Sequence, residues 1–132
     1  MMFFLVQFVL WLLAAYHLPM GALALCAPRL APKLVRSLYG ASIGDSGHVR
    51  YLTSMIGALA VAVGGLAAVA ALSPATNHPI IAALFVLQLS RIFCRIRDRQ
   101  LLANSFGMSV RANSAAILVL SVESVVLALG LR

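Results

Sequence analysis

Four long stretches of the chain are apolar almost without interruption, and short polar segments separate them. Each stretch is close to the roughly 20 residues that a helix needs to cross a bilayer. Transmembrane strands would be shorter and would alternate apolar and polar positions, whereas these runs are continuous. We therefore predict an all-α fold, an integral membrane four-helix bundle that forms a single domain over residues 1–132. Its helices are expected at about 3–25, 51–72, 79–96 and 113–131.

Composition supports the membrane assignment. The chain is 63% hydrophobic and 10% charged, with a mean hydropathy of +1.03, whereas soluble domains carry about 25% charged residues. A formal net charge of +7 would suggest nucleic acid as the partner of a soluble protein. Here the basic residues lie between apolar segments, so the charge favours lipid headgroups and argues against nucleic acid.

The basic residues also predict an orientation. The first connector carries Arg29, Lys33, Arg36 and Arg50, and the third carries Arg97, Arg99 and Arg111. The second connector, residues 73–79, contains neither Lys nor Arg. Because basic loops stay in the cytoplasm, we expect the first and third connectors there and both termini on the non-cytoplasmic side. The predicted location is the bacterial inner membrane, as a multi-pass protein.

The first connector contains an amphipathic pattern at residues 28–39. Leu30, Leu34 and Leu38 recur every four residues, while Arg29, Lys33 and Arg36 fall elsewhere around the helical turn. Such a helix lies in the headgroup plane with its cations toward lipid phosphates. The alternative interpretation is a basic cytoplasmic loop with no further role.

The second apolar segment carries small residues at helical spacing. They are Gly57, Ala60, Gly64, Gly65 and Ala68. Small residues allow two helix backbones to approach closely in a membrane. We therefore expect these residues to pack against another helix, either within the bundle or in another chain.

Ionisable residues inside predicted spans are candidates for function. Glu123 lies roughly 15 Å into the fourth span and Arg91 roughly 7–8 Å from the same face, at 1.5 Å of rise per residue. Gln88 lies one turn from Arg91, and we expect His17 at a similar depth. Three interpretations of Glu123 stay open: an ion pair with Arg91, a ligand or proton site, and a neutral hydrogen-bonded carboxyl group without Arg91.

Other chemistry is weakly indicated. GDSG at residues 44–47 matches part of a serine protease signature, but the rest of that machinery does not fit in this chain. Cys26 and Cys94 are expected to be reduced packing thiols. His17 fits a hydrogen bond between helices better than haem or chlorophyll ligation. The sequence predicts no metal site and no catalytic residues, and the cofactor stays unknown.

Four short segments carry a resemblance to a known family. They are LYG (38–40), RYLTSMIGALAVAVGGL (50–66), LSRIF (89–93) and VESVVLALGL (122–131). On these segments the chain resembles small bacterial four-helix membrane proteins of unknown function, of the DoxX-like kind. The resemblance implies that Arg50, Arg91 and Glu123 occupy recurrent positions, and it implies no activity. The Arg-rich segment at 91–107 departs from the pattern.

These observations favour a non-catalytic role. We expect a small membrane subunit that packs against and stabilises a larger membrane complex or a homo-oligomer. The alternative is a small transporter or lipid-binding protein that uses the polar cluster of His17, Gln88, Arg91 and Glu123. An enzyme of lipid metabolism is a third reading of the same features.

Overall fold

The computed structural model describes residues 2–44 and 46–132, and the regular elements in this part of the chain are all helical. They are α1 (Met2–Cys26), α2 (Ala31–Tyr39), α3 (Gly47–Leu72), the 3-10 turn η1 (Pro74–Thr76), α4 (His78–Arg97), α5 (Arg99–Phe106) and α6 (Val110–Leu129). Four of them, α1, α3, α4 and α6, are long and apolar enough to cross a membrane. The predicted all-α membrane architecture is therefore confirmed.

Two of the spans begin earlier than predicted because serine residues cap them. Ser46 precedes α3, and its Oγ accepts a hydrogen bond from Val49 N at 3.3 Å. Ser109 precedes α6 and accepts from Ala112 N at 3.1 Å. A serine in this position satisfies one of the unpaired backbone donors at a helix start. As a result, each helix extends into a segment that the hydropathy pattern assigned to a connector.

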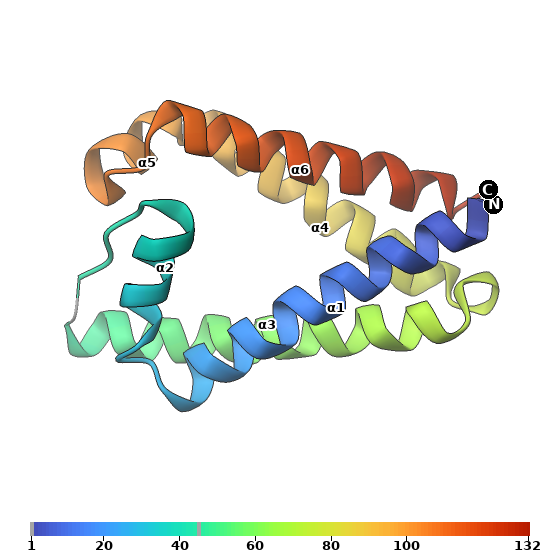
Figure 1. Ribbon diagram of the computed structural model, residues 1–132, viewed down its shortest axis with the longest axis horizontal. Coiled ribbons are helices and arrows are strands. Elements are labelled where there is room, and N and C mark those ends of the chain that lie inside the picture. Colours follow the sequence, from blue (N-terminus) through green and yellow to red (C-terminus); the bar gives the residue numbers. More distant parts are fainter. Residues whose placement is uncertain (1, 45) are drawn as a thin grey trace.

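The four spans form two antiparallel pairs, α1 with α3 and α4 with α6 (Figure 1). The pairs meet at the end of the molecule that holds both chain termini and diverge toward the end that holds α2 and α5. Buried apolar side chains fill the meeting end: Val6, Val9, Leu10, Leu13, Ala14, Ala67, Ala70, Ala71, Ile81, Leu84, Val126 and Leu127. The buried core is therefore concentrated at the end that holds the chain termini.

Glycine residues bring α1 and α3 into backbone contact. A Cβ added at Gly57 would lie 2.6 Å from Leu25 N, and one added at Gly21 would lie 2.7 Å from Val61 N. A Cβ at Gly64 would lie 2.9 Å from Leu18 N. Real side chains do not tolerate such distances, so these three positions require glycine for the helices to touch.

The prediction for Gly65 differs from what the structure shows. A Cβ at Gly65 would meet no heavy atom of the described residues within 4 Å. The helix turns by about 100° per residue, so Gly65 faces away from the α1 contact that Gly64 makes. Of the other predicted packing residues, Ala68 packs against the core, while Ala60 lines a cavity.

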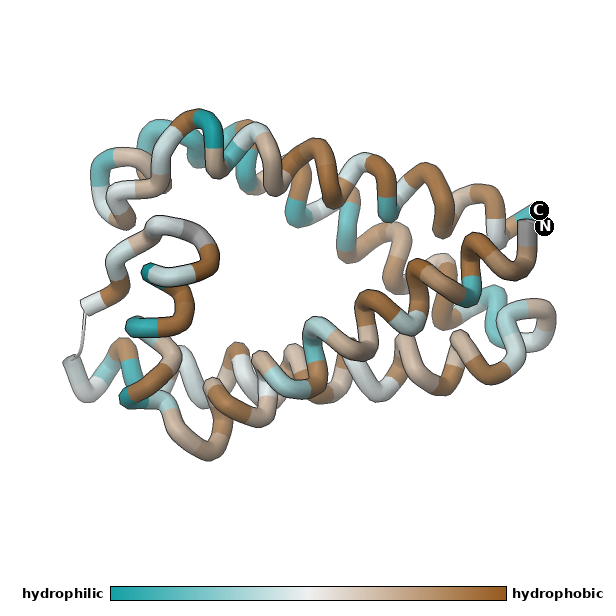
Figure 2. The backbone as a smooth tube through the Cα atoms, in the orientation of Figure 1, coloured by the Kyte–Doolittle hydropathy of each residue, from teal (hydrophilic) through white to brown (hydrophobic). Residues whose placement is uncertain are grey.

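Both basic connectors contain a helix. The amphipathic helix expected in the first connector is present as α2, with Pro32 in its first turn and Gly40 (φ 64°) ending it in the left-handed conformation. Helix α5 was not predicted, because it is short and its apolar positions show no clear period. Figure 2 shows hydrophilic positions on both connector helices and on the adjacent ends of the spans. A hydrogen bond from Ser42 N to Phe106 O, 2.7 Å long, joins the two connectors.

Candidate functional site

Four polar side chains from three spans meet beside the apolar core. His17 comes from α1, Gln88 and Arg91 come from α4, and Glu123 comes from α6. Arg91 Nη1 donates to Gln88 Oε1 at 2.9 Å and lies 3.4 Å from His17 Nε2. Gln88 Nε2 in turn donates to Glu123 Oε2. The structure thus brings together the four residues that the sequence placed at similar depth, and we call them the polar cluster.

The hydrogen bonds of the cluster determine the state of its histidine. His17 Nδ1 lies 2.9 Å from Leu13 O, which only accepts, so Nδ1 carries the proton. Arg91 has donors and no acceptor, so His17 Nε2 must accept from Arg91 Nη1. His17 is therefore a neutral imidazole that is protonated on Nδ1. This arrangement uses both ring nitrogens within the protein, as expected for a histidine that bonds between helices.

Gln88 stands between the guanidinium group of Arg91 and the carboxyl group of Glu123. No nitrogen–oxygen contact within 4 Å joins Arg91 to Glu123, both of which are described by the structure; the direct ion pair is replaced by a bridge through Gln88. Gln88 is only 2% exposed, and its amide is suited to this place because it accepts on one side and donates on the other. The amide thereby links α4 to α6 at the level where α1 also reaches Arg91.

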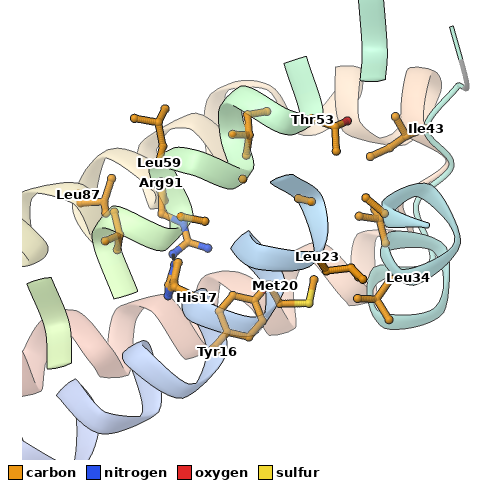
Figure 3. A pocket seen from close by; sticks show the side chains of 17 residues that line it. Tyr16, His17, Met20, Leu23, Leu34, Ile43, Thr53, Leu59, Leu87 and Arg91 are labelled. Carbon is orange, nitrogen blue, oxygen red and sulfur yellow. Dashed lines mark hydrogen bonds between the residues drawn. The ribbon is translucent and has the colours of Figure 1, made fainter. Parts of the chain in front are cut away.

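A cavity of about 360 Å³ lies next to the cluster, between α1, α2, α3 and α4. Its walls are mainly apolar, and Figure 3 shows Arg91 and His17 toward one end and Leu34 and Ile43 toward the other. The exposed side chains of Ile56 and Leu59 also line it, so the cavity is open on that side of α3. The result is an apolar space with a cation at one end.

Arg91 keeps hydrogen-bonding capacity toward this cavity. Its two bonds both use Nη1, and Nε and Nη2 bond to none of the described residues. These atoms are not sealed inside protein, since the described part of the chain contains no buried side-chain nitrogen or oxygen without a partner. A guanidinium group held by one nitrogen and accessible at the other two is arranged to bind an acceptor group.

A second, smaller cavity of about 190 Å³ lies on the other side of the cluster. Tyr16, His17 and Arg91 line both cavities, whereas Glu123 and Arg95 line the smaller one and not the larger one. The polar cluster therefore forms the partition between the two spaces. Neither cavity was predicted, because no sequence pattern shows that the helix pairs diverge at this level.

The residues predicted to contact lipid headgroups lie on and beside α2 and are not part of the polar cluster. Arg29, Lys33 and Arg36 are exposed on and just before α2, while Ala31, Leu34 and Val35 of the same segment line the larger cavity. One face of α2 therefore covers the cavity, and the other presents the basic side chains. The amphipathic pattern gave the two faces of this helix, but it did not show what the apolar face covers.

Comparisons with known proteins do not extend this description. No protein-family model, curated protein or solved structure matches the chain. The resemblance to DoxX-like proteins therefore extends only to the four-span helical membrane architecture.

Proposed function

We propose that the protein is a non-catalytic membrane protein that binds a single-tailed anionic lipid, such as a fatty acid. The lipid would occupy the cavity between α1, α2, α3 and α4, the larger of the two beside the polar cluster. The observation that carries this proposal is the position of Arg91, whose Nε and Nη2 remain available at one end of a mainly apolar space. A carboxylate head would bond to this edge of the guanidinium group. The tail would lie along Met20, Leu23 and Leu34 beneath α2.

The head group supplies the selectivity in this proposal. A lipid tail gains little when it leaves other tails for an apolar protein wall, because the surrounding bilayer is equally apolar. A charge-assisted bond inside an apolar cavity is stronger than a neutral one. Gln88 and His17 support this role, since they fix the guanidinium group through Nη1 without using its other donors.

Filling the cavity provides the test of this function. Ala60 lines the cavity, and Ala60→Leu is expected to weaken palmitate binding roughly tenfold, which corresponds to about 1.4 kcal/mol. Ala83→Leu adds the same atoms to an exposed position of α4 and is expected to leave binding unchanged. Binding is measured by native mass spectrometry of the purified chain with palmitate or with hexadecanol, which lacks the negative charge. Equal retention of palmitate by both variants, or equal binding of palmitate and hexadecanol, contradicts the proposal.

A second function, as a membrane subunit or homo-oligomer, is favoured by the outward face of α3. The inner glycines of this helix are occupied by α1, but Ala58 and Ala62 are exposed, and Gly65 continues the same row. A row of small residues on a lipid-facing surface would allow a second helix to approach. The same native mass spectra test this function. It predicts a dimer or a co-purified protein in place of a bound lipid.

The orientation in the membrane is a further part of the proposal. We infer that α2 and α5 lie in the cytoplasm of a bacterial cell, because the two connectors that contain them, together with the adjoining ends of the spans, hold most of the basic residues. With Cys26 and Cys94 first replaced by serine, Ala75→Cys is expected to react with an impermeant thiol reagent in whole cells, and Ser105→Cys only after lysis. Both positions are exposed, so accessibility within the protein is matched. Labelling of Ser105→Cys alone in whole cells would reverse the orientation.

A further inference from the structure

A third cavity, separate from the proposed lipid site, lies at the connector end of the second helix pair. It has a volume of about 410 Å³ and is bounded by the end of α4, by α5 and by the start of α6. Its polar lining comprises Arg95, Arg99, Gln100, Asn104, Asn113 and Ser114. Two guanidinium groups and several hydrogen-bonding side chains thus surround one space, and no carboxylate of the described residues lines it.

Arg95 is fixed in this cavity by one nitrogen. Its Nη1 donates to Asn113 Oδ1 at 3.0 Å and to Met108 Sδ at 3.6 Å, while Asn113 Nδ2 donates back to Arg95 O at 3.2 Å. Nε and Nη2 of Arg95 bond to none of the described residues. These two nitrogens form the edge of the guanidinium group that binds two phosphate oxygens at once. Arg99, four residues further along the chain at the start of α5, is exposed.

The carboxylate closest to these arginines in the sequence, Asp98, does not neutralise them. Asp98 pairs with Arg97, with Arg97 Nη2 2.8 Å from Asp98 Oδ2 and a second hydrogen bond from Nε. The hydrogen bonds from Arg97 hold the pKa of Asp98 below its ordinary value, so this pair stays ionised and is neutral as a whole. The charge that faces the cavity is therefore that of Arg95 and Arg99.

The position of the cavity favours a phosphate that belongs to a lipid over a free phosphate ion. It lies where two spans end, which is the level of lipid headgroups in a membrane protein. The exposed apolar side chains of Ile96 and Val110 form part of its lining and continue onto the lipid-facing surfaces of α4 and α6. A phospholipid would place its phosphate between the arginines and its acyl chains along these surfaces, whereas a free phosphate ion would leave the apolar rim unused.

We propose that this cavity binds the phosphate headgroup of an anionic phospholipid. Arg95 binds the phosphate with the free edge of its guanidinium group, Arg99 adds a second positive charge, and the amides of Gln100 and Asn104 are placed to bond to the rest of the headgroup. Bound lipid would then tie α5 to the ends of α4 and α6. This site is distinct from the fatty acid site, because the two cavities share no lining residue, although Arg95 also lines the smaller cavity beside the polar cluster.

The test compares lipids and arginines in the full chain. Melting temperature in detergent is followed during titration with phosphatidylglycerol, phosphatidylcholine or inorganic phosphate. We expect phosphatidylglycerol to raise the melting temperature of the unmodified chain, and Arg99→Gln to weaken its apparent affinity roughly fivefold, the effect of losing one basic residue at a membrane surface. Arg111→Gln removes an exposed arginine that does not line the cavity, and it is expected to bind phosphatidylglycerol like the unmodified chain.

A second variant separates binding from folding. Arg95→Lys keeps the charge and a donor toward Asn113 but removes the two-nitrogen edge, so it is expected to weaken phosphatidylglycerol binding with little change in the melting temperature without lipid. The proposal is overturned if Arg99→Gln and Arg95→Lys both bind phosphatidylglycerol as Arg111→Gln does. It is also overturned if phosphatidylcholine or inorganic phosphate stabilises the protein as strongly as phosphatidylglycerol, since the cavity would then be unselective or would take a free ion.

Discussion

Gly57→Ala is expected to lower the free energy of unfolding by about 2–3 kcal/mol, the upper part of the range for overpacked positions. The added Cβ would lie 2.6 Å from Leu25 N, 2.8 Å from Gly21 O and 2.9 Å from the carbonyl carbon of Ala24. All three are backbone atoms, which cannot rotate away as the end of a side chain can. Helix α1 must therefore move away from α3, and the contact that organises the first helix pair is weakened along its length.

Gly65→Ala supplies a matched control for this prediction, because it makes the same substitution on the same helix. A Cβ at Gly65 meets no heavy atom of the described residues within 4 Å, so only the gain in helix propensity remains. That gain is at most about 1 kcal/mol, so stability should stay level or rise slightly. Unfolding of both variants is measured by titration with a denaturing detergent and followed by circular dichroism. Equal losses for the two variants would show that α1 and α3 do not touch at Gly57.

The glycine contact between α1 and α3 was only partly predictable from the spacing of small residues. Small residues in the second apolar segment predicted a close helix contact, and Gly57 and Gly64 make one. The pattern could not select between the faces of the helix, since Gly64 and Gly65 are neighbours in sequence and point in different directions. The partner, Gly21 of α1, went unnoticed because it has no small neighbour four residues away that faces the same contact.

The polar cluster was predictable to a similar extent. Residue depth along each span placed Glu123 and Arg91 about one side-chain length apart, with Gln88 one turn from Arg91 and His17 at a similar depth, because helical rise is constant. The order of their hydrogen bonds depends on side-chain rotamers and on the separation of α4 and α6, which the sequence does not encode in any local pattern. The bridging position of Gln88 is therefore a structural result, and so are the two cavities beside the cluster.

Gln88→Leu is expected to destabilise the protein by about 2 kcal/mol. The substitution removes the acceptor of Arg91 Nη1 and the donor to Glu123 Oε2 together, and it leaves the guanidinium group and the carboxyl group each short of a partner between the spans. Stranding a buried charge costs more than a polar contact between membrane helices contributes, which is typically about 0.6 kcal/mol and at most about 1.7. Gln100→Leu makes the same change at an exposed position of α5 and should alter stability by less than about 0.5 kcal/mol.

If Gln88 bridges Arg91 and Glu123, the effects of substituting these two residues should be coupled. Arg91→Leu and Glu123→Leu each remove one end of the bridge, so their combined loss in the double variant should be smaller than the sum of the single losses, by about 1 kcal/mol. These variants form a double-mutant cycle. If Gln88 carries the coupling, the same cycle measured in a protein that also contains Gln88→Leu should give additive losses of stability. Coupling that persists without Gln88 would mean that Arg91 and Glu123 interact through space, and the bridge would then be incidental.

Glu123→Gln distinguishes the carboxylate charge from its acceptor role. Its amide oxygen still accepts from Gln88, so a role in packing predicts a loss below about 1 kcal/mol, whereas a loss as large as that of Glu123→Leu would show that the cluster depends on the negative charge opposite Arg91.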